Sequence, residues 1–439
     1  MSNKPWHAIF TPTIGKSIRY AAKMLKHGGS AFPGKIVEQI DAGFLARTLS
    51  ALPYGVVLVS GTNGKTTTTR MVASMFESLG LRVFTNPTGS NFTRGVVSAL
   101  LQEVTLSGVL HADIAVLELD EAYAVHFVKQ IKPRYTLLLN VMRDQLDRFG
   151  EIDNTAKLLK TVAENTTDTI ILNREDPRIS AISNTIPEQV HVSYFGLDPQ
   201  IASKFPTDDT LHDRQMHKQH VQTSVPKHDA DVELVSFAEH SGTFRINGEE
   251  VSTSLRINGM YNIFNAAAAA ATIRAVLREN PPSTQELLQA LSNVTPAFGR
   301  GEVIEVNGQP VELLLVKNPI GFSLALQSFP PDNTSTMIAI GDEYADGRDM
   351  SWLWDVDFTS LHDGVRMVTG ARAWDMTLRL AYDQVPVVAT NTNIEEALHE
   401  FLVNGENKPK HIFCTYTTML HIRALLSQYA HVEDVGVGK

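Results

Sequence analysis

Apolar runs alternate with helical stretches along most of the chain. In the first half, near-continuous apolar runs occupy residues 56–60, 114–119, 135–141 and 169–172. Strands that are apolar on both faces and separated by helices are typical of a parallel sheet covered on its two sides. Consecutive alanines at 266–271 predict a helix that packs closely against a neighbour. We therefore predict an α/β fold.

A second alternating region follows Gly299. Its apolar runs occupy residues 311–316, 336–340, 366–369, 385–389 and 411–414. We predict an N-terminal helical segment (1–50), a central domain (51–298) and a smaller doubly wound domain (299–439). Between two parts of the central domain, residues 196–240 contain many polar side chains and are predicted to form an insertion.

The stretch from Ile14 to His27 is basic and amphipathic, with Lys16, Arg19, Lys23 and Lys26 set among apolar residues. It predicts a helix. The helix either packs on the protein surface or lies close to anionic lipid head groups, and the pattern alone leaves both interpretations open.

Composition narrows the class of protein. The chain has 439 residues, of which 43% are hydrophobic and 20% charged, as in globular proteins. The net charge of −10 argues against general nucleic-acid binding, which requires a basic surface. The single cysteine, Cys414, excludes an internal disulfide and is interpreted as core filler. No apolar run is long enough to span a bilayer and no secretory signal is evident, so we expect a cytoplasmic protein.

The most informative motif follows the first strand of the central domain. Residues 61–67 read Gly61-Thr62-Asn63-Gly64-Lys65-Thr66-Thr67 and lead into a helical stretch. Strand, glycine turn, Lys-Thr and helix are the order that a phosphate-binding loop requires. The loop is a shortened variant, because Val59 stands where the usual pattern has its first glycine. The alternative is a glycine turn that precedes Lys-Thr by chance.

A carboxylate at the end of a neighbouring strand would complete a magnesium site. Glu118 lies in the apolar run 114–119, and Asp120 and Glu121 follow it. An acid within an apolar strand is costly to bury without a function, whereas Asp120 and Glu121 can be ordinary solvated residues at a strand end.

Together with the phosphate loop, further segments resemble the Mur ligases and, more closely, the MurT family. They are Gly89-Ser90-Asn91, residues 143–151 (RDQLDRFGE), residues 258–265 (NGMYNIFN), residues 316–321 (VKNPIG) and residues 344–355 (YADGRDMSWLWD). The likeness covers nearly the whole chain. It implies a Mur-ligase-like fold, with a central parallel-sheet P-loop ATPase domain and a smaller Rossmann-like C-terminal domain.

The resemblance also implies an activity, that of an ATP-dependent carbon–nitrogen ligase. A MurT-like subunit uses ATP and Mg²⁺ to phosphorylate the α-carboxylate of D-glutamate in the lipid II stem peptide. Ammonia from a GatD-type glutaminase subunit then gives D-isoglutamine in peptidoglycan biosynthesis. Because lipid II is a membrane lipid, the resemblance also suggests a place at the inner face of the cell membrane.

Roles carry over by position. The resemblance implies that Gly61, Thr62, Asn63, Gly64 and Thr67 bind nucleotide, with Lys65 on phosphate and Thr66 and Glu118 on magnesium. It places Asn265 at the adenine and brings Arg300 to the nucleotide from the domain junction.

Asp349 is implied to reach the partner and complete its Cys-His pair. Asp346, Asp355 and Asp357 compete for that role, and without the resemblance the cluster reads as a charged loop.

The chain departs from the family in two places. MurT-like chains commonly carry a four-cysteine zinc ribbon, but residues 196–240 contain no cysteine. Histidines 212, 217, 220, 228 and 240 match no standard metal-site spacing, so we expect no structural zinc. Gln145 stands where amino-acid-adding Mur ligases have histidine, a departure that the MurT family shares.

Two other functions stay open from the sequence. One is a ligase that adds an amino acid to a carboxylate, as folylpolyglutamate synthase does, with no glutaminase partner. The other is a scaffold that binds nucleotide without catalysis, against which the intact Lys65, Thr66 and Glu118 argue.

Overall fold

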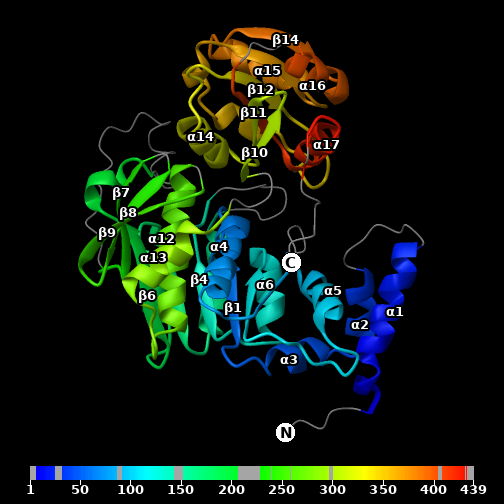
Figure 1. Cartoon of the computed structure of the whole chain (residues 1–439), viewed down its shortest axis with the longest axis vertical. Coiled ribbons are helices and arrows are strands. Elements are labelled where there is room, and N and C mark those ends of the chain that lie inside the picture. Colours follow the sequence, from blue (N-terminus) through cyan, green and yellow to red (C-terminus); the bar gives the residue numbers. More distant parts are fainter. Residues whose placement is uncertain are drawn as a thin grey trace.

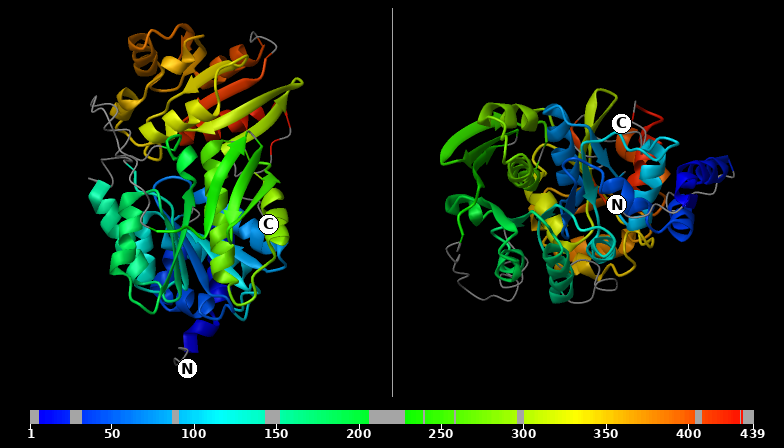
Figure 2. Two further views of the ribbon diagram at one scale, coloured as in Figure 1. Left: turned by 90° about the vertical axis from the view of Figure 1, so that its left-hand side faces the viewer. Right: turned by 90° about the horizontal axis from the view of Figure 1, so that it is seen from below.

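The computed structural model describes residues 6–24, 32–86, 91–142, 152–205, 228–238, 240–257, 259–295, 300–403, 408–430 and 432. Two sheets organise these residues, a nine-stranded sheet and a six-stranded sheet. The smaller sheet lies at one end of the molecule, above the larger one in the view of Figure 1, and Figure 2 shows the same stacking from the side.

The larger sheet has the strand order β2-β3-β1-β4-β5-β6-β7-β8-β9. Neighbours are parallel from β2 to β7, whereas β7, β8 and β9 pair antiparallel. The strands are β1 (Val56–Ser60), β2 (Val83–Thr85), β3 (Ile114–Glu118), β4 (Tyr135–Leu138), β5 (Thr169–Asn173), β6 (His191–Leu197), β7 (Val232–Ala238), β8 (Ser241–Ile246) and β9 (Glu249–Ser254). Because β1 lies between β3 and β4, the segments that follow these three strands meet at one edge.

Helices cover both faces of the larger sheet. Val57 and Val59 pack towards α4 (Lys65–Ser78) and α12 (Met260–Val276), with α13 (Thr284–Ser292) beside them. Val56 and Leu58 face the other layer. That layer contains α5 (Thr93–Glu103), α6 (Glu121–Val128) and, further along the sheet, α8 (Ile152–Glu164), α9 (Pro177–Ser180) and the 3-10 helix η2 (Ala181–Thr185). Alanines 266–271 are each at most 1% exposed, and their small side chains allow α12 to lie close to α4.

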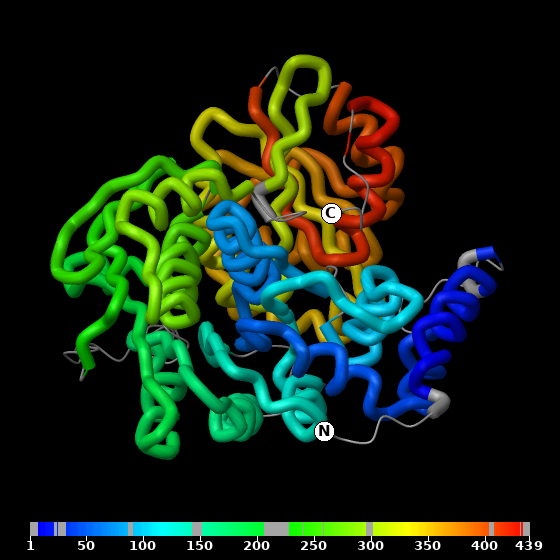
Figure 3. Tube along the Cα trace, turned by 60° about the horizontal axis from the view of Figure 1, so that its bottom comes forward, coloured from blue at the N-terminus to red at the C-terminus, as the bar shows by residue number. Residues whose placement is uncertain are grey.

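The N-terminal segment is a small helical appendage. It comprises η1 (Trp6–Ile9), α1 (Thr11–Met24), α2 (Phe32–Ile40) and α3 (Phe44–Leu49). α2 packs between α1 and α5, so that α1 is the outermost helix on this side (Figure 3). Among the described residues, no helix combines the length and apolarity needed to cross a membrane.

The smaller sheet has the strand order β10-β11-β15-β12-β13-β14, parallel except for the β10–β11 hairpin. Its strands are β10 (Arg300–Val306), β11 (Gln309–Leu315), β12 (Ser335–Ala339), β13 (Val365–Thr369), β14 (Val387–Asn391) and β15 (Lys410–Cys414). One face packs on α14 (Pro319–Ser328), η3 (Ser351–Asp355), η4 (Thr359–Leu361) and α15 (Ala373–Tyr382). The other packs on α16 (Ile394–Val403) and α17 (Tyr416–Leu426), where Cys414 is fully buried as core filler.

The predicted strands and the alanine-rich helix are confirmed. The antiparallel end of the larger sheet was not predicted, and the segment interpreted as an insertion supplies part of it. The first two residues of this segment, 196–197, are the last two of β6, and α10 (Pro199–Ala202) follows them. Strand β7 lies near the end of the segment. Residues 206–227 lie outside the described part of the chain. The domain boundaries stay predictions, and the one near Phe298 falls on residues that are not described.

Candidate active site

The turn after β1 depends on two glycines. Gly61 has φ +132° and Gly64 has φ +84°, backbone conformations that L side chains rarely adopt. A Cβ on Gly61 would lie 3.0 Å from the backbone nitrogen of Asn140, and one on Gly64 would lie 2.8 Å from Nδ2 of Asn265. Both the backbone angle and the neighbours therefore require glycine at these two positions, as the phosphate-loop prediction expects.

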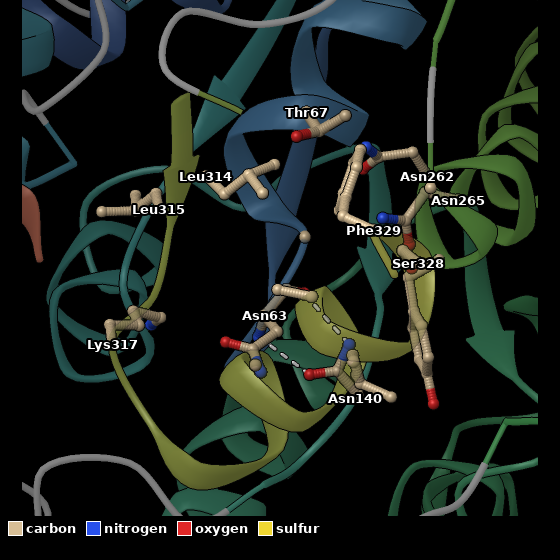
Figure 4. A pocket seen from close by; sticks show the side chains of 16 residues that line it. Asn63, Thr67, Asn140, Asn262, Asn265, Leu314, Leu315, Lys317, Ser328 and Phe329 are labelled. Atoms are coloured by element: carbon tan, nitrogen blue, oxygen red, sulfur yellow. Dashed lines mark hydrogen bonds between the residues drawn. The ribbon is translucent and has the colours of Figure 1, made fainter. Parts of the chain in front are cut away.

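Asn140 braces this loop from the end of β4. Its Oδ1 accepts from the Asn63 backbone N–H (2.8 Å), and its Nδ2 donates to the Asn63 carbonyl (3.0 Å) (Figure 4). The Asn140 carbonyl also accepts from the Thr62 N–H at 3.0 Å. The loop is thus held in shape by a neighbouring strand end, without help from a ligand.

Lys65 is the first residue of α4, and its side chain folds back over the loop. It is only 6% exposed. Its Nζ donates to the Gly61 carbonyl at 2.6 Å and lies 3.1 Å from a carboxylate oxygen of Asp120 and 3.7 Å from one of Glu121. Asp120 and Glu121 therefore offset the cost of burying the ammonium group. These contacts favour a role for both acids in positioning Lys65 over their interpretation as ordinary solvated residues at a strand end.

Thr66 and Glu118 place two oxygen atoms together at the start of α4. The Thr66 hydroxyl donates to Oε1 of Glu118 at 2.8 Å, and Glu118 is 7% exposed. Asn86, after β2, fixes the Glu118 backbone with two hydrogen bonds of 2.9 Å. A hydroxyl and a carboxylate oxygen are the hard ligands that Mg²⁺ takes while it keeps several waters.

The donor set therefore fits magnesium held by few protein groups. Within the described residues, no cluster of three or more His, Cys, Asp or Glu side chains that could hold a metal occurs.

A cavity of about 160 Å³ opens beside the loop, between the two sheets. On the side of the larger sheet it is lined by Asn63 of the loop, Thr67 of α4 and Asn265 of α12. On the side of the smaller sheet it is lined by Leu314 of β11 and by Phe329, which follows α14 (Figure 4). The ring of Phe329 lies beside the polar side chains of Asn262 and Asn265 (Figure 4). The cavity can accept a flat base next to a phosphate group, with Asn265 positioned to contact either part.

Arg300 is only partly placed. It begins β10 and pairs with Leu314 of β11, which lines the cavity. Its backbone thus lies next to a residue of the cavity lining, while its side chain is outside the described part, so its contact with the nucleotide stays a prediction.

The acidic loop 342–357 belongs to the smaller sheet and contributes no residue to the cavity lining. Asp349 is exposed, and hydrogen bonding from Ser351 lowers the pKa of its carboxyl group (Ser351 N to Oδ1, 2.9 Å). Asp346, by contrast, is 1% exposed and accepts from the backbone N–H of Thr417 at 2.7 Å. Asp357 is exposed and accepts from Thr359 within its own turn, at 2.9 Å from the backbone N–H. Exposure therefore favours Asp349 over Asp346 as the residue that meets another protein.

Several residues singled out in the sequence are not described, namely Gly89, Ser90, residues 143–151 with Gln145, Asn258, His212, His217 and His220. Of the remaining histidines in the 196–240 segment, His228 stacks on Tyr194 with ring centroids 4.7 Å apart, and His240 is exposed.

Sequence reasoning missed Asn86 and Asn140 and gave Lys317 no role. Asn86 follows the short strand β2, and Asn140 is a polar residue near the end of the predicted run 135–141. A polar residue at a strand's carboxyl end was therefore a usable signal in both cases. Lys317 follows β11, and its Nζ donates to the Thr62 carbonyl at 3.0 Å. That contact joins the two sheets, and no local pattern could reveal it.

Two family models and several known proteins match the chain. The family described as "MurT ligase C-terminal" matches residues 315–419, and "Mur ligase middle domain" matches residues 59–273. The chain is 30% identical to the lipid II isoglutaminyl synthase (glutamine-hydrolyzing) subunit MurT of Streptococcus pneumoniae, over 94% of this chain and 95% of that protein. It is 29% identical to the subunit of the same name from Staphylococcus aureus, over 88% and 89% of the two chains.

Among solved structures, the MurF ligase of Thermotoga maritima in complex with ADP is similar. It has a TM-score of 0.64 at 18% identity and covers 89% of this chain and 83% of that one. This similarity confirms the predicted Mur-ligase-like fold. Together with the match to MurT along nearly the full length, it shows that the chain belongs to the MurT family of Mur ligases.

Proposed function

We propose that this chain uses ATP to activate the α-carboxylate of D-glutamate in the stem peptide of lipid II, so that ammonia can convert it to D-isoglutamine. The relatives that it matches over nearly their whole length carry the name lipid II isoglutaminyl synthase subunit. The observation that carries the proposal is the start of α4. There a glycine turn, the buried Lys65 and the Thr66–Glu118 pair stand together at the carboxyl edge of the sheet.

The chemistry follows from what these groups can stabilise. A carboxylate is a poor electrophile until one of its oxygens becomes part of a leaving group. A carboxylate oxygen attacks the terminal phosphorus of ATP, the bond to ADP breaks, and an acyl phosphate forms. Ammonia then forms the C–N bond, the C–O bond to phosphate breaks, and phosphate leaves with the former carboxylate oxygen. The nitrogen loses one proton, which the departing phosphate takes up.

Lys65 would bind the phosphoryl oxygens as charge moves between them. Mg²⁺, held through Thr66 and Glu118, would neutralise further negative charge on the phosphates.

The decisive experiment varies the acceptor. With ATP, Mg²⁺ and lipid II, we expect ammonia to stimulate phosphate release and amide formation, whereas added amino acids should not. Stimulation by an amino acid alone would instead support a ligase of the folylpolyglutamate synthase type. Lys65→Ala should abolish turnover while the protein stays folded, with the exposed Lys132→Met as a control. Unchanged turnover in Lys65→Ala would contradict the catalytic role.

We further propose that ammonia comes from a glutaminase subunit of the GatD type, and that Asp349 orients the histidine of that subunit's Cys-His pair. The exposed carboxylate on the smaller sheet supports this, because a triad acid must reach across an interface. Asp349→Asn should lower glutamine-dependent amidation but spare amidation with free ammonium salts. Asp357→Asn, in the same loop, is the matched control. An equal loss with both nitrogen sources would place Asp349 at the ATP site instead.

For location, we propose that α1 rests on the anionic inner face of the cell membrane. The helix contains Lys16, Arg19 and Lys23 and no acidic residue, and Tyr20 and Met24 are each 69% exposed. Sedimentation with vesicles containing anionic lipid, but not with neutral vesicles, is the expected result. Tyr20→Ser combined with Met24→Ser should weaken binding, and an undiminished bound fraction would contradict the proposal.

A further inference from the structure

Two lysines from different sheets meet at one carbonyl oxygen. Lys317 follows β11 of the smaller sheet, and its Nζ donates to the Thr62 carbonyl at 3.0 Å. Lys65, at the start of α4, donates to the same carbonyl at 3.3 Å. Figure 4 shows Lys317 on the segment that continues from the strand carrying Leu314 and Leu315. The two ammonium groups therefore point at the same part of the phosphate loop.

Such an arrangement carries an electrostatic cost. Like charges near one another in a partly buried site repel more strongly than they do in water. On the Lys65 side, Asp120 and Glu121 lie within 3.1 and 3.7 Å of its Nζ and relieve part of this repulsion. A multiply charged anion between the two ammonium groups would relieve it further, and the adjoining start of α4 favours negative charge as well. The geometry thus matches a phosphoryl group bound from two sides.

A second contact fixes the position of Lys317. The next residue, Asn318, is 1% exposed and pairs with the loop residue Asn63 through both of its amide atoms. Its Nδ2 donates to Oδ1 of Asn63 at 3.1 Å, and its Oδ1 accepts from Nδ2 of Asn63 at 3.4 Å. The same Oδ1 accepts from the Gly321 N–H at 2.7 Å and so caps α14. Asn318 therefore has a single orientation in which it can satisfy both the helix and the loop.

An apolar contact supports the same junction. Met142, which follows β4, packs against Ile320 and Leu324 of α14. The amide pair and this small apolar cluster together dock the smaller sheet where Lys317 reaches Thr62.

We propose that Lys317 is a second catalytic cation, which contacts the phosphoryl group as it passes from ATP to the substrate carboxylate and then stays on the acyl phosphate. The inference rests on the proposed function. Lys317 gains and loses no proton in either step, since its role is to neutralise charge on the phosphoryl oxygens. Asn318 is a positioning residue, because it acts on the reaction only through the placement of Lys317 beside Asn63.

The test compares Lys317→Met, which removes the charge and keeps most of the length of the side chain, with Lys317→Arg, which keeps the charge. Lys132→Met is the matched control, since Lys132 is an exposed lysine in the loop between α6 and β4, away from the cavity lining. Loss of one preorganised charge contact to a transition state typically lowers kcat by roughly 100-fold or more. We expect that loss in Lys317→Met, a change of less than about tenfold in the Kd for ADP, and recovery of at least about a tenth of kcat in Lys317→Arg.

Two results would overturn the inference. One is a kcat in Lys317→Met that stays close to wild type. The other is a loss that Lys317→Arg does not recover and that is accompanied by a lower melting temperature in both variants, which would make Lys317 structural. In both cases ammonia-dependent turnover by the wild-type protein would leave the proposed function standing. A wild-type protein with no such turnover would remove the function itself.

Asn318→Ser tests the positioning role, because serine can still cap α14 but is too short to reach Asn63. We expect kcat to fall less than in Lys317→Met while the Kd for ADP stays constant. An unchanged kcat would show that Asn318 does not position Lys317.

Discussion

The two sheets differ in how the backbone N–H groups at the start of a helix are satisfied at their carboxyl edges. In the larger sheet α4 begins after Gly64, which has no side chain to cap the helix and whose φ is +84°. In the smaller sheet α17 begins beside Asp346, whose carboxylate accepts from the Thr417 N–H at 2.7 Å and also from the Thr417 hydroxyl. In the smaller sheet a carboxylate of the protein thus occupies the helix start. In the larger sheet the helix start has Gly64 and Lys65 and lies beside a cavity.

That difference supports the proposal that the two sheets of this chain have different tasks. A helix N-terminus attracts negative charge, and a buried carboxylate that satisfies it removes it as a binding site. The edge of the smaller sheet is therefore closed by the protein itself, and its exposed acid, Asp349, faces solvent instead. The larger sheet keeps an edge at which a phosphate group can take the place that Asp346 occupies in the smaller one.

The largest expected effect comes from adding a side chain to the glycine at the start of α4. Gly64→Ala forces a residue with a Cβ into positive φ and brings that Cβ to 2.8 Å from Asn265. This Cβ would displace Asn265 beside the phosphate loop, so the Kd for ADP should rise by roughly tenfold, a change of about 1.4 kcal/mol in binding free energy. Isothermal titration calorimetry measures it.

Gly80→Ala is the matched control, because Gly80 has φ +89° and a Cβ there would meet nothing within 4 Å. It should destabilise the fold through backbone strain alone and leave nucleotide affinity unchanged. Equal losses of affinity in the two variants would mean that strain, and not the space beside Asn265, decides binding.

A smaller effect is expected from removing the built-in anion of the other sheet. Asp346→Ala leaves the Thr417 N–H without its acceptor and should lower the free energy of unfolding by about 1–3 kcal/mol. Asp357→Ala, which removes an exposed acid from the same loop, should cost less. Urea denaturation compares them. If Asp346→Ala were as stable as wild type, the contrast between the two helix starts would lose its structural meaning.

The smallest effect concerns a buried histidine of the smaller sheet. Burial lowers the pKa of His411 to about 4, although Nε2 lies 3.7 Å from a Glu312 oxygen, and desolvation outweighs that neighbour because the side chain is only 11% exposed. The unfolded chain binds a proton more readily between the ordinary pKa and the lowered one. Stability should therefore decline as pH falls below about 6.5, by roughly 1–2 kcal/mol at pH 5.

His411→Gln should flatten this dependence, whereas a substitution of the exposed His362 should not change it. Thermal unfolding at pH 7 and pH 5 measures the difference. An identical decline in His411→Gln would show that other groups cause it.

The sequence predicted what depends on neighbours along the chain. The loop from Gly61 to Thr67 could be predicted because a strand, two glycines and Lys-Thr occupy adjacent positions, and Glu118 because it interrupts an apolar strand. The antiparallel strands β7 to β9 were not predicted. The segment before them is polar and was interpreted as an insertion, although the sheet continues with β7 at Val232.

Contacts between distant segments could not be predicted. Asn140 pairs with Asn63 across 77 residues, and Lys317 reaches Thr62 across 255. Both contacts follow from the order of strands in the sheets and from the docking of one sheet on the other. Exposure, which favours Asp349 over Asp346, likewise appears only once the chain is folded, because both acids lie in one polar loop.

The central claim is that the loop before α4 passes a phosphoryl group to a carboxylate of the substrate. It is tested most directly by labelling that carboxylate with ¹⁸O and measuring the mass of the phosphate released during amidation with ATP and ammonia. The account predicts that each phosphate released with an amide carries one ¹⁸O atom, because the acyl phosphate breaks at its C–O bond. Unlabelled phosphate, or amide formed equally fast without ATP, would contradict it.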